Sequence, residues 1–183
     1  MSRAITACRG RSVPGVPGYR VPMARTATPA IAALVAAGID HQVIQYHHDP
    51  RNDSFGAEAV AQLAADGFAA EQVFKTLVIA LPKGLAVAVL PVPSKLSLKA
   101  AAAALGVPKA EMADPAAAQR SSGYVVGGIS PLGQRKPLPT VVDASALAFD
   151  KVLCSAGKRG WDIALAPADL IRATGAVTAD IAV

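Results

Sequence analysis

Aromatic residues, cysteine and long hydrophobic runs are all scarce in this chain of 183 residues. Aromatic side chains make up 4% of the sequence although 52% of it is hydrophobic, which predicts a core built mainly from Ala, Val and Leu. No apolar run approaches the roughly 20 residues that cross a bilayer, so we expect no transmembrane segment and no membrane partner. The two cysteines, Cys8 and Cys154, are too few for a disulfide framework and fit a reducing, cytoplasmic compartment. Cys154 lies in an apolar run, which predicts a buried thiol.

Motifs for metal binding, phosphate binding and nucleophilic catalysis are also missing. The three histidines, His41, His47 and His48, lack the spacing of a zinc motif and have no cysteine near them. The chain contains no G-x-x-x-x-G-K-S/T phosphate loop, no G-x-S-x-G nucleophile elbow and no Cys/His signature. We therefore expect no metal and no cofactor, and the residues alone give no conventional nucleophile–base pair.

Basic residues are unevenly distributed. Five of the 18 basic residues are arginines that precede the first acidic residue, Asp40, and the remaining 13 balance 13 acidic residues. Residues 75–136 nevertheless carry eight basic and only two acidic residues. A positive face on a neutral domain favours a phosphate-bearing partner held by few contacts over general DNA binding, with an ordinary solvated surface as the alternative.

The first 25 residues differ in composition from the rest. Residues 1–25 are rich in Arg, Gly and Pro without periodicity, which predicts a disordered tail before a single domain at 26–183. The tail lacks the apolar segment of a secretory signal. Its Arg-rich, acid-free composition weakly resembles an organellar transit peptide, and it fits equally well a translation start assigned too early, with Met23 as the candidate start.

Capping and turn residues divide the domain into short helices and strands. Helices are predicted between Thr28 and Gly38, at 57–66, from Ser97 to Gly106, at 115–119 and at 167–174, with a helical turn at 143–148. Strands are predicted at 41–46, 73–81, 85–92, 138–142, 151–155, 161–165 and 177–181. Six or seven strands with hairpin-like spacing and scattered short helices predict an α+β domain with a mixed, strongly curved sheet.

The glycine-rich stretch at 123–133 is the most unusual segment. Four of its eleven residues are glycine, and the apolar run Tyr124–Val126 predicts a strand that ends in the Gly127-Gly128 pair. A loop of this kind exposes backbone N–H groups and can bind an anion, a carbonyl or a sugar–phosphate. A tight structural turn is the alternative.

Two sets of polar residues stand out beside this loop. Lys75 lies inside an otherwise apolar strand, where burial is costly unless the ammonium is paired or faces a cleft. Lys158 and Arg159 lie in a glycine-flanked turn that suits an anion, and Asp162, which follows, can accept hydrogen bonds from an amine or hydroxyl. The alternatives are a Lys75 that reaches solvent and a solvated hairpin turn.

Several stretches resemble the bacterial YbaK/EbsC family over about residues 28–182. They are VFKTL at 73–77, EMADP at 111–115, QRSSGYVVGGISPLG at 119–133 and SAGKRG at 155–160, together with TPA at 28–30 and Y-x-HDP at 46–50. The resemblance implies a compact single α+β domain around a mixed, barrel-like sheet with peripheral short helices. It also implies an aminoacyl-tRNA deacylase, related to the editing domain of bacterial prolyl-tRNA synthetase, that hydrolyses mischarged Cys-tRNA(Pro).

The resemblance also implies roles for individual residues. Lys75 would contact the 3′-terminal adenosine or its phosphate. The aminoacyl pocket would be lined by Tyr46, Phe55, Thr76, Gly127 and Asp162. We expect Lys75, Gly127 and Asp162 to be the catalytic residues, with Gly127 acting through its backbone. The remaining expected substrate-binding residues are Tyr46, Phe55, Thr76, Gly128, Ser130, Lys158 and Arg159.

The mechanism implied by the family explains why the chain has no conventional nucleophile, because the substrate supplies it. The thiol of the mischarged cysteine attacks its own ester carbonyl, while the protein orients the ester and stabilises the oxyanion. One alternative is a sister enzyme that hydrolyses Ala-tRNA(Pro) with water as the nucleophile. A second is a non-catalytic module that binds the tRNA acceptor end or a synthetase. The expected partners are tRNA(Pro) and, in a ternary complex, prolyl-tRNA synthetase.

Overall fold

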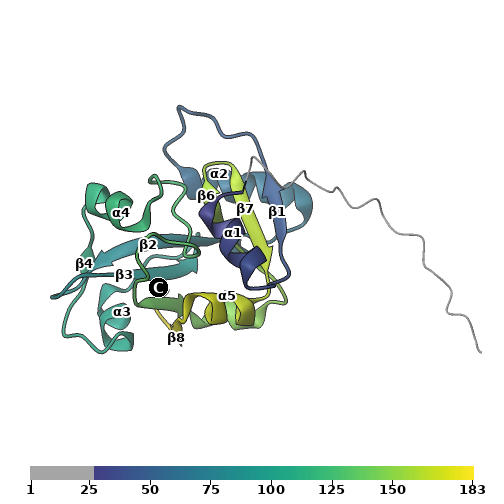
Figure 1. Cartoon of the computed structure of the whole chain (residues 1–183). Coiled ribbons are helices and arrows are strands. Elements are labelled where there is room, and N and C mark those ends of the chain that lie inside the picture. The colour runs from purple at the N-terminus through teal and green to yellow at the C-terminus, as the bar shows by residue number, and fades with distance from the viewer. Residues whose placement is uncertain (1–26) are drawn as a thin grey trace, which may run out of the picture.

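The computed structural model describes residues 27–183 (Figure 1). The predicted disordered tail at 1–25 and the candidate start at Met23 lie outside the described residues. Five α-helices, three short 3-10 helices and eight strands follow one another in the described part of the chain, which confirms the predicted α+β class.

The strands of residues 27–183 form two sheets. The first has three antiparallel strands in the order β1 (Gln42–Gln45), β7 (Trp161–Leu165) and β6 (Val152–Lys158). The second has five strands in the order β4 (Glu111–Met112), β2 (Phe74–Ala80), β3 (Leu85–Pro91), β5 (Thr140–Asp143) and β8 (Val177–Ala179). The second sheet is mixed, because β3–β5 and β5–β8 are parallel and its other pairs are antiparallel.

The two sheets are linked where β2 begins. Val73 forms a parallel bridge with Leu153 of β6, and the ends of β2 and β6 lie side by side in Figure 1. The mixed sheet is thus confirmed, but within the described residues the strands number eight, and they divide between two sheets without closing into a barrel. The strand that was not predicted, β4, has only two residues, too few to show an alternating pattern.

The predicted caps set the ends of the helices. The side chains of Thr28, Ser97 and Asp114 accept hydrogen bonds from the first turns of α1, α3 and α4. The α-helices are α1 (Pro29–Ala36), α2 (Phe55–Leu63), α3 (Leu98–Ala104), α4 (Pro115–Ser122) and α5 (Pro167–Thr174). The 3-10 helices are η1 (Ala64–Asp66), η2 (Ala70–Gln72) and η3 (Ala144–Ala148).

The prediction of a strand at Tyr124–Val126 is wrong. The stretch leaves α4 directly as an irregular loop, in which Tyr124 is buried whereas Val125 and Val126 are exposed. The Tyr124 hydroxyl donates a hydrogen bond to the carbonyl oxygen of Leu132 at 2.8 Å, and so ties the two ends of the loop together. The apolar run therefore contributes an anchor to the loop rather than a strand to a sheet.

The core consists of small aliphatic side chains on both faces of the five-stranded sheet. Phe74, Val78 and Val89 pack between the two sheets against residues that include buried Cys154. The opposite face packs against α3 through a second cluster of buried residues. Because side chains alternate along a strand, Thr76 belongs to the face between the sheets and Lys75 to the other face.

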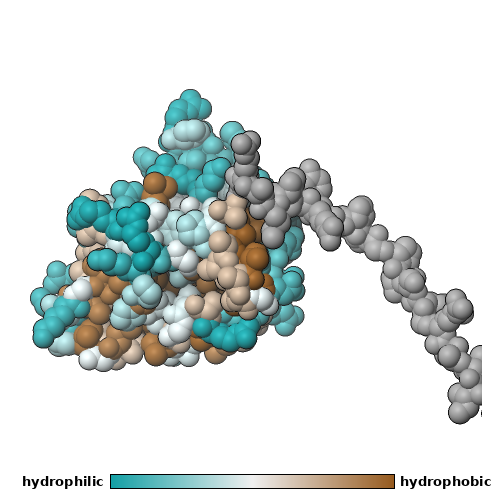
Figure 2. Space-filling view, viewed as in Figure 1, coloured by the Kyte–Doolittle hydropathy of each residue, from teal (hydrophilic) through white to brown (hydrophobic). Residues whose placement is uncertain are grey.

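The surface of the domain is hydrophilic over the loop between β1 and α2, which projects from the top of the molecule in Figure 2. Polar residues also cover α4 and the loop that follows it, while apolar residues gather over α1 (Figure 2). Within residues 27–183, none of the helices has the length and apolar character needed to cross a membrane.

Candidate active site

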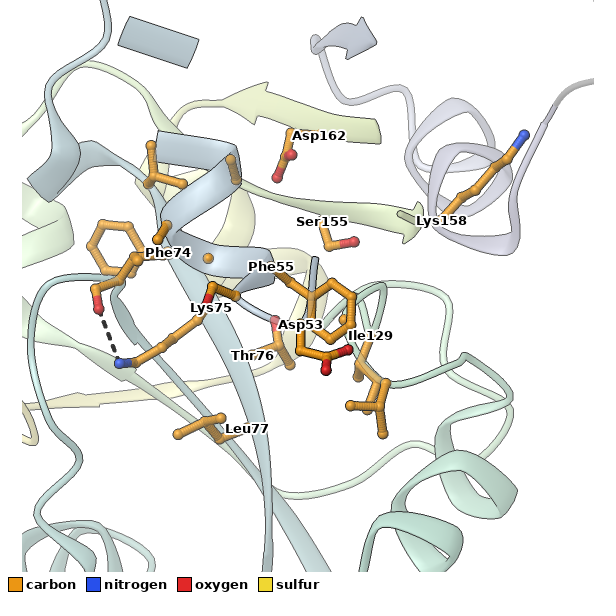
Figure 3. Close-up of a pocket in the computed structure, with 18 of the residues that line it drawn as sticks. Asp53, Phe55, Phe74, Lys75, Thr76, Leu77, Ile129, Ser155, Lys158 and Asp162 are labelled. Atoms are coloured by element: carbon orange, nitrogen blue, oxygen red, sulfur yellow. Dashed lines mark hydrogen bonds between the residues drawn. The ribbon is translucent and has the colours of Figure 1, made fainter. Parts of the chain in front are cut away.

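A cavity of about 560 Å³ lies where the two sheets, α2, α4 and the glycine-rich loop meet. Its wall combines the end of β1, the start of α2, the edge of β2, the loop after α4 and the β6–β7 hairpin (Figure 3). Cavities of this size hold small organic ligands. Of the predicted site residues, those that line it are Tyr46, Phe55, Lys75, Thr76, Gly127, Lys158 and Asp162.

The cavity follows an edge of β2 that is only partly covered. β4 pairs with Ile79 and Ala80 alone, so the β2 residues before them have no β4 partner. Thr76 lies in this part of the strand, and its buried hydroxyl has no hydrogen-bond partner in the described residues. An unpaired buried hydroxyl is costly, and one that lines a cavity is available to a ligand.

Lys75 also lines the cavity, and backbone carbonyl groups hold its ammonium group in place. The Nζ atom donates hydrogen bonds to the backbone carbonyl oxygens of Val92, at 3.0 Å, and Ser94. Figure 3 draws one hydrogen bond from this ammonium group. Partial burial lowers the pKa of Lys75. An ammonium has three donors, so one remains for a phosphate or hydroxyl of a ligand.

Asp162 brings a buried carboxyl to the cavity. It lies in the central strand of the three-stranded sheet, opposite Ile44 and Ser155, and is 5% exposed. Burial raises its pKa to about 6, while its interaction with the Tyr46 hydroxyl acts in the opposite direction. No Lys or Arg in residues 27–183 forms a salt bridge with it, so this carboxylate is free to receive a cationic ligand group.

Tyr46 is placed next to Asp162 by the end of β1, where its N–H donates to the carbonyl oxygen of Gly160 at 2.8 Å. Burial raises the pKa of the Tyr46 phenol, and the nearby Asp162 carboxylate raises it further. The hydroxyl therefore stays protonated at neutral pH and acts as a hydrogen-bond donor beside the carboxylate.

Phe55 is the first residue of α2 and packs against Gly127. The helix start is anchored by Glu58, whose carboxylate bonds His48 Nδ1 at 2.6 Å and accepts from the Asp49 N–H at 2.9 Å. The His48 and Phe55 rings lie 5.7 Å apart. This arrangement fixes the aromatic wall of the cavity against the glycine-rich loop.

The two cations of the β6–β7 turn take different positions. Lys158 lines the cavity, and its Nζ lies 4.8 Å from the centre of the Trp161 ring. The guanidinium of Arg159 lies outside the cavity lining, 4.5 Å from the Phe55 ring, and donates two hydrogen bonds to the Val126 carbonyl oxygen. Arg159 is thus engaged by the protein itself.

Gly128 and Ser130 do not line the cavity. The Gly128 N–H donates to the Val125 carbonyl oxygen at 2.9 Å, and a Cβ atom at position 128 would come 3.0 Å from the Arg159 backbone nitrogen. Ser130 is fully buried, and its hydroxyl oxygen accepts from the Leu132 N–H at 3.2 Å. In this structure both residues shape the loop and are not placed to contact a ligand in the cavity.

Several lining residues were not predicted as site residues from the sequence. They include Asp53, Met112, Ile129, Ser155 and Trp161. Ser155 had a detectable signal, since it is the polar residue in an apolar strand and pairs with Asp162. Neither histidine nor cysteine is found among the lining residues, and residues 27–183 contain no group of three or more His, Cys, Asp or Glu that could hold a metal.

Comparison with known proteins identifies the family of this chain. Residues 53–173 match the model of the family described as the aminoacyl-tRNA editing domain. A relative from Enterococcus faecalis, provisionally named Cys-tRNA(Pro)/Cys-tRNA(Cys) deacylase EbsC, is 37% identical over 138 residues, which are 75% of this chain and 83% of the relative. The solved structure of a provisionally assigned trans-editing enzyme for prolyl tRNA synthetase is 26% identical with a TM-score of 0.75, over 88% of this chain and 99% of that one. The chain therefore belongs to the aminoacyl-tRNA editing domain family.

Proposed function

We propose that this protein is a deacylase that removes cysteine from mischarged Cys-tRNA(Pro). The family match supports an editing activity, and the substrate named for the Enterococcus faecalis relative supports cysteine and tRNA(Pro). Because the chain is similar to a provisionally assigned trans-editing enzyme over 88% of its length, we propose that it acts in trans, on tRNA that a separate synthetase has charged.

The observation that carries this proposal is the buried Asp162 carboxylate without a cationic partner in the described residues. A buried carboxylate is costly unless it is paired. An aminoacyl ester brings an α-ammonium group, which would pair with Asp162 while the ester lies near the Thr76 hydroxyl and Gly127. Lys75 and Lys158 would then lie on the side of the terminal adenosine and its phosphate.

The absence of histidine and cysteine from the cavity lining favours attack by the thiol of the substrate. In the first step, the thiol gives up its proton as its sulfur forms a bond to the ester carbonyl carbon, and the bond from that carbon to the ribose oxygen breaks. The thiol proton goes to the ribose oxygen, so tRNA leaves with its hydroxyl and the amino acid leaves as a cyclic thioester. Water then opens the thioester to free cysteine.

The Gly127 backbone N–H is the proposed donor to the oxyanion of the first step. It donates to no acceptor among the described residues, whereas the neighbouring Gly128 N–H is used within the turn. Loss of one such donor costs on the order of 10²–10³ in rate in known enzymes. Proline has no thiol, so correctly charged Pro-tRNA(Pro) would be spared by its chemistry.

We propose tRNA(Pro) and prolyl-tRNA synthetase as partners, and the cytoplasm as the place where they meet. Residues 26–183 carry equal numbers of basic and acidic residues, which favours weak intrinsic affinity for tRNA. A ternary complex with the synthetase would supply the missing affinity. Addition of synthetase should then lower the KM for Cys-tRNA(Pro).

The test is release of labelled cysteine from Cys-tRNA(Pro) by the wild-type protein and by Asp162→Asn and Lys75→Ala. We expect both variants to lose at least about tenfold in kcat/KM, because each removes a charge that contacts the substrate. Asp150→Asn is the matched control, since Asp150 is an exposed carboxylate outside the cavity. Wild-type rates in both site variants would remove this cavity from the reaction, and binding without release of cysteine would indicate a non-catalytic module.

A further inference from the structure

The proposed oxyanion donor belongs to a tight turn formed by residues 125–128. The Gly128 N–H donates to the Val125 carbonyl oxygen at 2.9 Å, which closes the turn. Gly127 occupies the third position with φ of +83°, the value of a type II turn. Type I and type II turns differ in the orientation of their central peptide, here the Val126 C=O and the Gly127 N–H. The direction of the proposed donor therefore depends on what holds this one peptide.

Arg159 is the group that holds it. Its Nε and Nη2 atoms donate to the Val126 carbonyl oxygen at 3.0 and 2.8 Å. Its guanidinium also lies 4.5 Å from the Phe55 ring centre, so the ring limits its movement. A planar guanidinium can direct two donors to one oxygen in a fixed geometry, which a lysine ammonium cannot reproduce.

The geometry of a trans peptide connects this contact to the cavity. Residues 27–183 contain no cis peptide bond, so the Gly127 N–H points opposite to the Val126 C=O. Arg159 lies outside the cavity lining and Gly127 belongs to it. The carbonyl end of this peptide is taken up by Arg159, and its N–H end points away from Arg159 with no acceptor in residues 27–183. Because Val126 and Gly127 both line the cavity, that N–H is available to a ligand there. A charged donor on the carbonyl also polarises the amide and strengthens its N–H as a donor.

We infer that Arg159 is a positioning residue that orients and polarises the Gly127 amide for the deacylation reaction. The effect on catalysis rests on the proposed function. The positioning of the Gly127 amide rests only on the contact between Arg159 and the Val126 carbonyl oxygen. It gives Arg159 a role different from the substrate contact that its glycine-flanked turn suggests. Arg159 acts through the backbone of another residue and does not touch the substrate.

The kinetic test compares Arg159→Met and Arg159→Lys with the wild type on Cys-tRNA(Pro) and on cysteinyl-adenosine, which lacks the phosphates of tRNA. We expect Arg159→Met to lower kcat about 10- to 100-fold on both substrates with little change in KM, and Arg159→Lys to fall between. Arg172→Met is the matched control, since Arg172 pairs with Asp169 on α5 and lies outside the cavity lining; it should leave both constants unchanged. A loss found only with tRNA, in KM, would overturn the inference and make Arg159 a phosphate contact.

A second readout does not depend on activity. In a ¹H–¹⁵N spectrum, Arg159→Met should shift the Gly127 amide resonance and broaden it through exchange between the two turn orientations, while Arg172→Met should leave it in place. An unchanged Gly127 resonance in folded Arg159→Met would overturn the inference even if activity fell. If the wild type released no cysteine but the resonance responded as expected, the proposed function would fail and the positioning contact would stand.

Discussion

The backbone of Gly127 lies directly against the ring of Phe55. A Cβ atom at position 127 would come 2.6 Å from both Cγ and Cδ2 of that ring, far closer than carbon atoms pack. Gly127 also has a φ of +83°, in the left-handed region that favours glycine. Two independent constraints thus require glycine here, and both act where the aromatic wall of the cavity meets the proposed oxyanion donor.

Gly127→Ala should therefore cost more than the backbone strain alone. Alanine at positive φ costs about 1 kcal/mol, and overlap with a packed ring adds about 1–3 kcal/mol. The control is Gly84→Ala in the β2–β3 turn, where φ is +88° but no atom lies within 4 Å of the added Cβ. Urea unfolding of both variants isolates the contribution of the overlap. Equal losses of stability in the two variants would show that the Phe55 ring moves aside at no cost. The contact with Phe55 would then not require glycine at position 127.

Asp162→Asn should stabilise the folded protein at neutral pH. The pKa of Asp162 is raised to about 6, above its ordinary value of 3.8, so the fold favours the protonated form. The stability that this group contributes is full below pH about 4 and is lost as the pH rises through 6. Asparagine carries no charge, so the variant should gain up to about 3 kcal/mol over the wild type above pH 7 and almost nothing near pH 4. A pH-independent difference in urea unfolding would contradict this assignment.

Thr76→Val should preserve or raise stability while it lowers activity, because the buried hydroxyl that it removes is unpaired. The Thr76 hydroxyl has no partner in the described structure, so its removal breaks no hydrogen bond. Thr140 is the matched control, because its hydroxyl donates to the Leu138 carbonyl oxygen at 3.0 Å. Thr140→Val should cost about 1 kcal/mol and spare activity. If Thr76→Val retained full kcat/KM on Cys-tRNA(Pro), the hydroxyl would have no role in the site.

Asp143 should behave in the opposite way to Asp162 although both carboxyls are buried. Burial acts to raise the pKa of Asp143, but hydrogen bonds from Ser145, Ile181 and Ala182 outweigh it and lower the pKa. The backbone N–H groups of Ile181 and Ala182 donate to it at 2.9 and 2.8 Å, so it ties the C-terminal segment to β5.

Asp143→Ala should therefore destabilise the protein by about 2–4 kcal/mol at pH 7, because buried amides lose a charged acceptor. A depressed pKa contributes stability above the ordinary carboxyl value, and this contribution is lost as the pH falls through the folded value. The difference between the wild type and Asp143→Asn should accordingly shrink below pH about 4. Exposed Asp150 provides the control, Asp150→Ala, and an equal effect at both positions would argue against the anchoring role.

Local signals made most of the fold predictable. The caps at Thr28, Ser97 and Asp114 and the alternation or apolar runs of the strands act over a few residues, and these elements form as expected. The apolar run Tyr124–Val126 led to a wrong strand prediction. Tyr124 instead anchors the loop through a hydrogen bond to the Leu132 carbonyl oxygen on its other side. The division into two sheets depends on which strands pair across long stretches of sequence, such as β1 with β7, and local patterns do not predict such pairings.

The site was predictable to a similar extent. Lys75 and Asp162 are polar residues in apolar strands, and the structure places both at the cavity. The role of Arg159 was harder to predict, because a cation between glycines can bind an external anion as well as an acceptor within the protein. Its acceptor is a backbone carbonyl of Val126, 33 residues earlier, and a backbone acceptor leaves no trace in the sequence.

The measurement that tests the central claim most directly is single-turnover deacylation of three substrates by the wild-type protein. They are Cys-tRNA(Pro), Ser-tRNA(Pro) and Cys-tRNA(Pro) with its thiol methylated. An intramolecular thiol gains greatly from proximity, so Cys-tRNA(Pro) should react at least about 100-fold faster than the other two. Equal rates on all three substrates would contradict the account, because water would then be the nucleophile and the substrate thiol would be irrelevant.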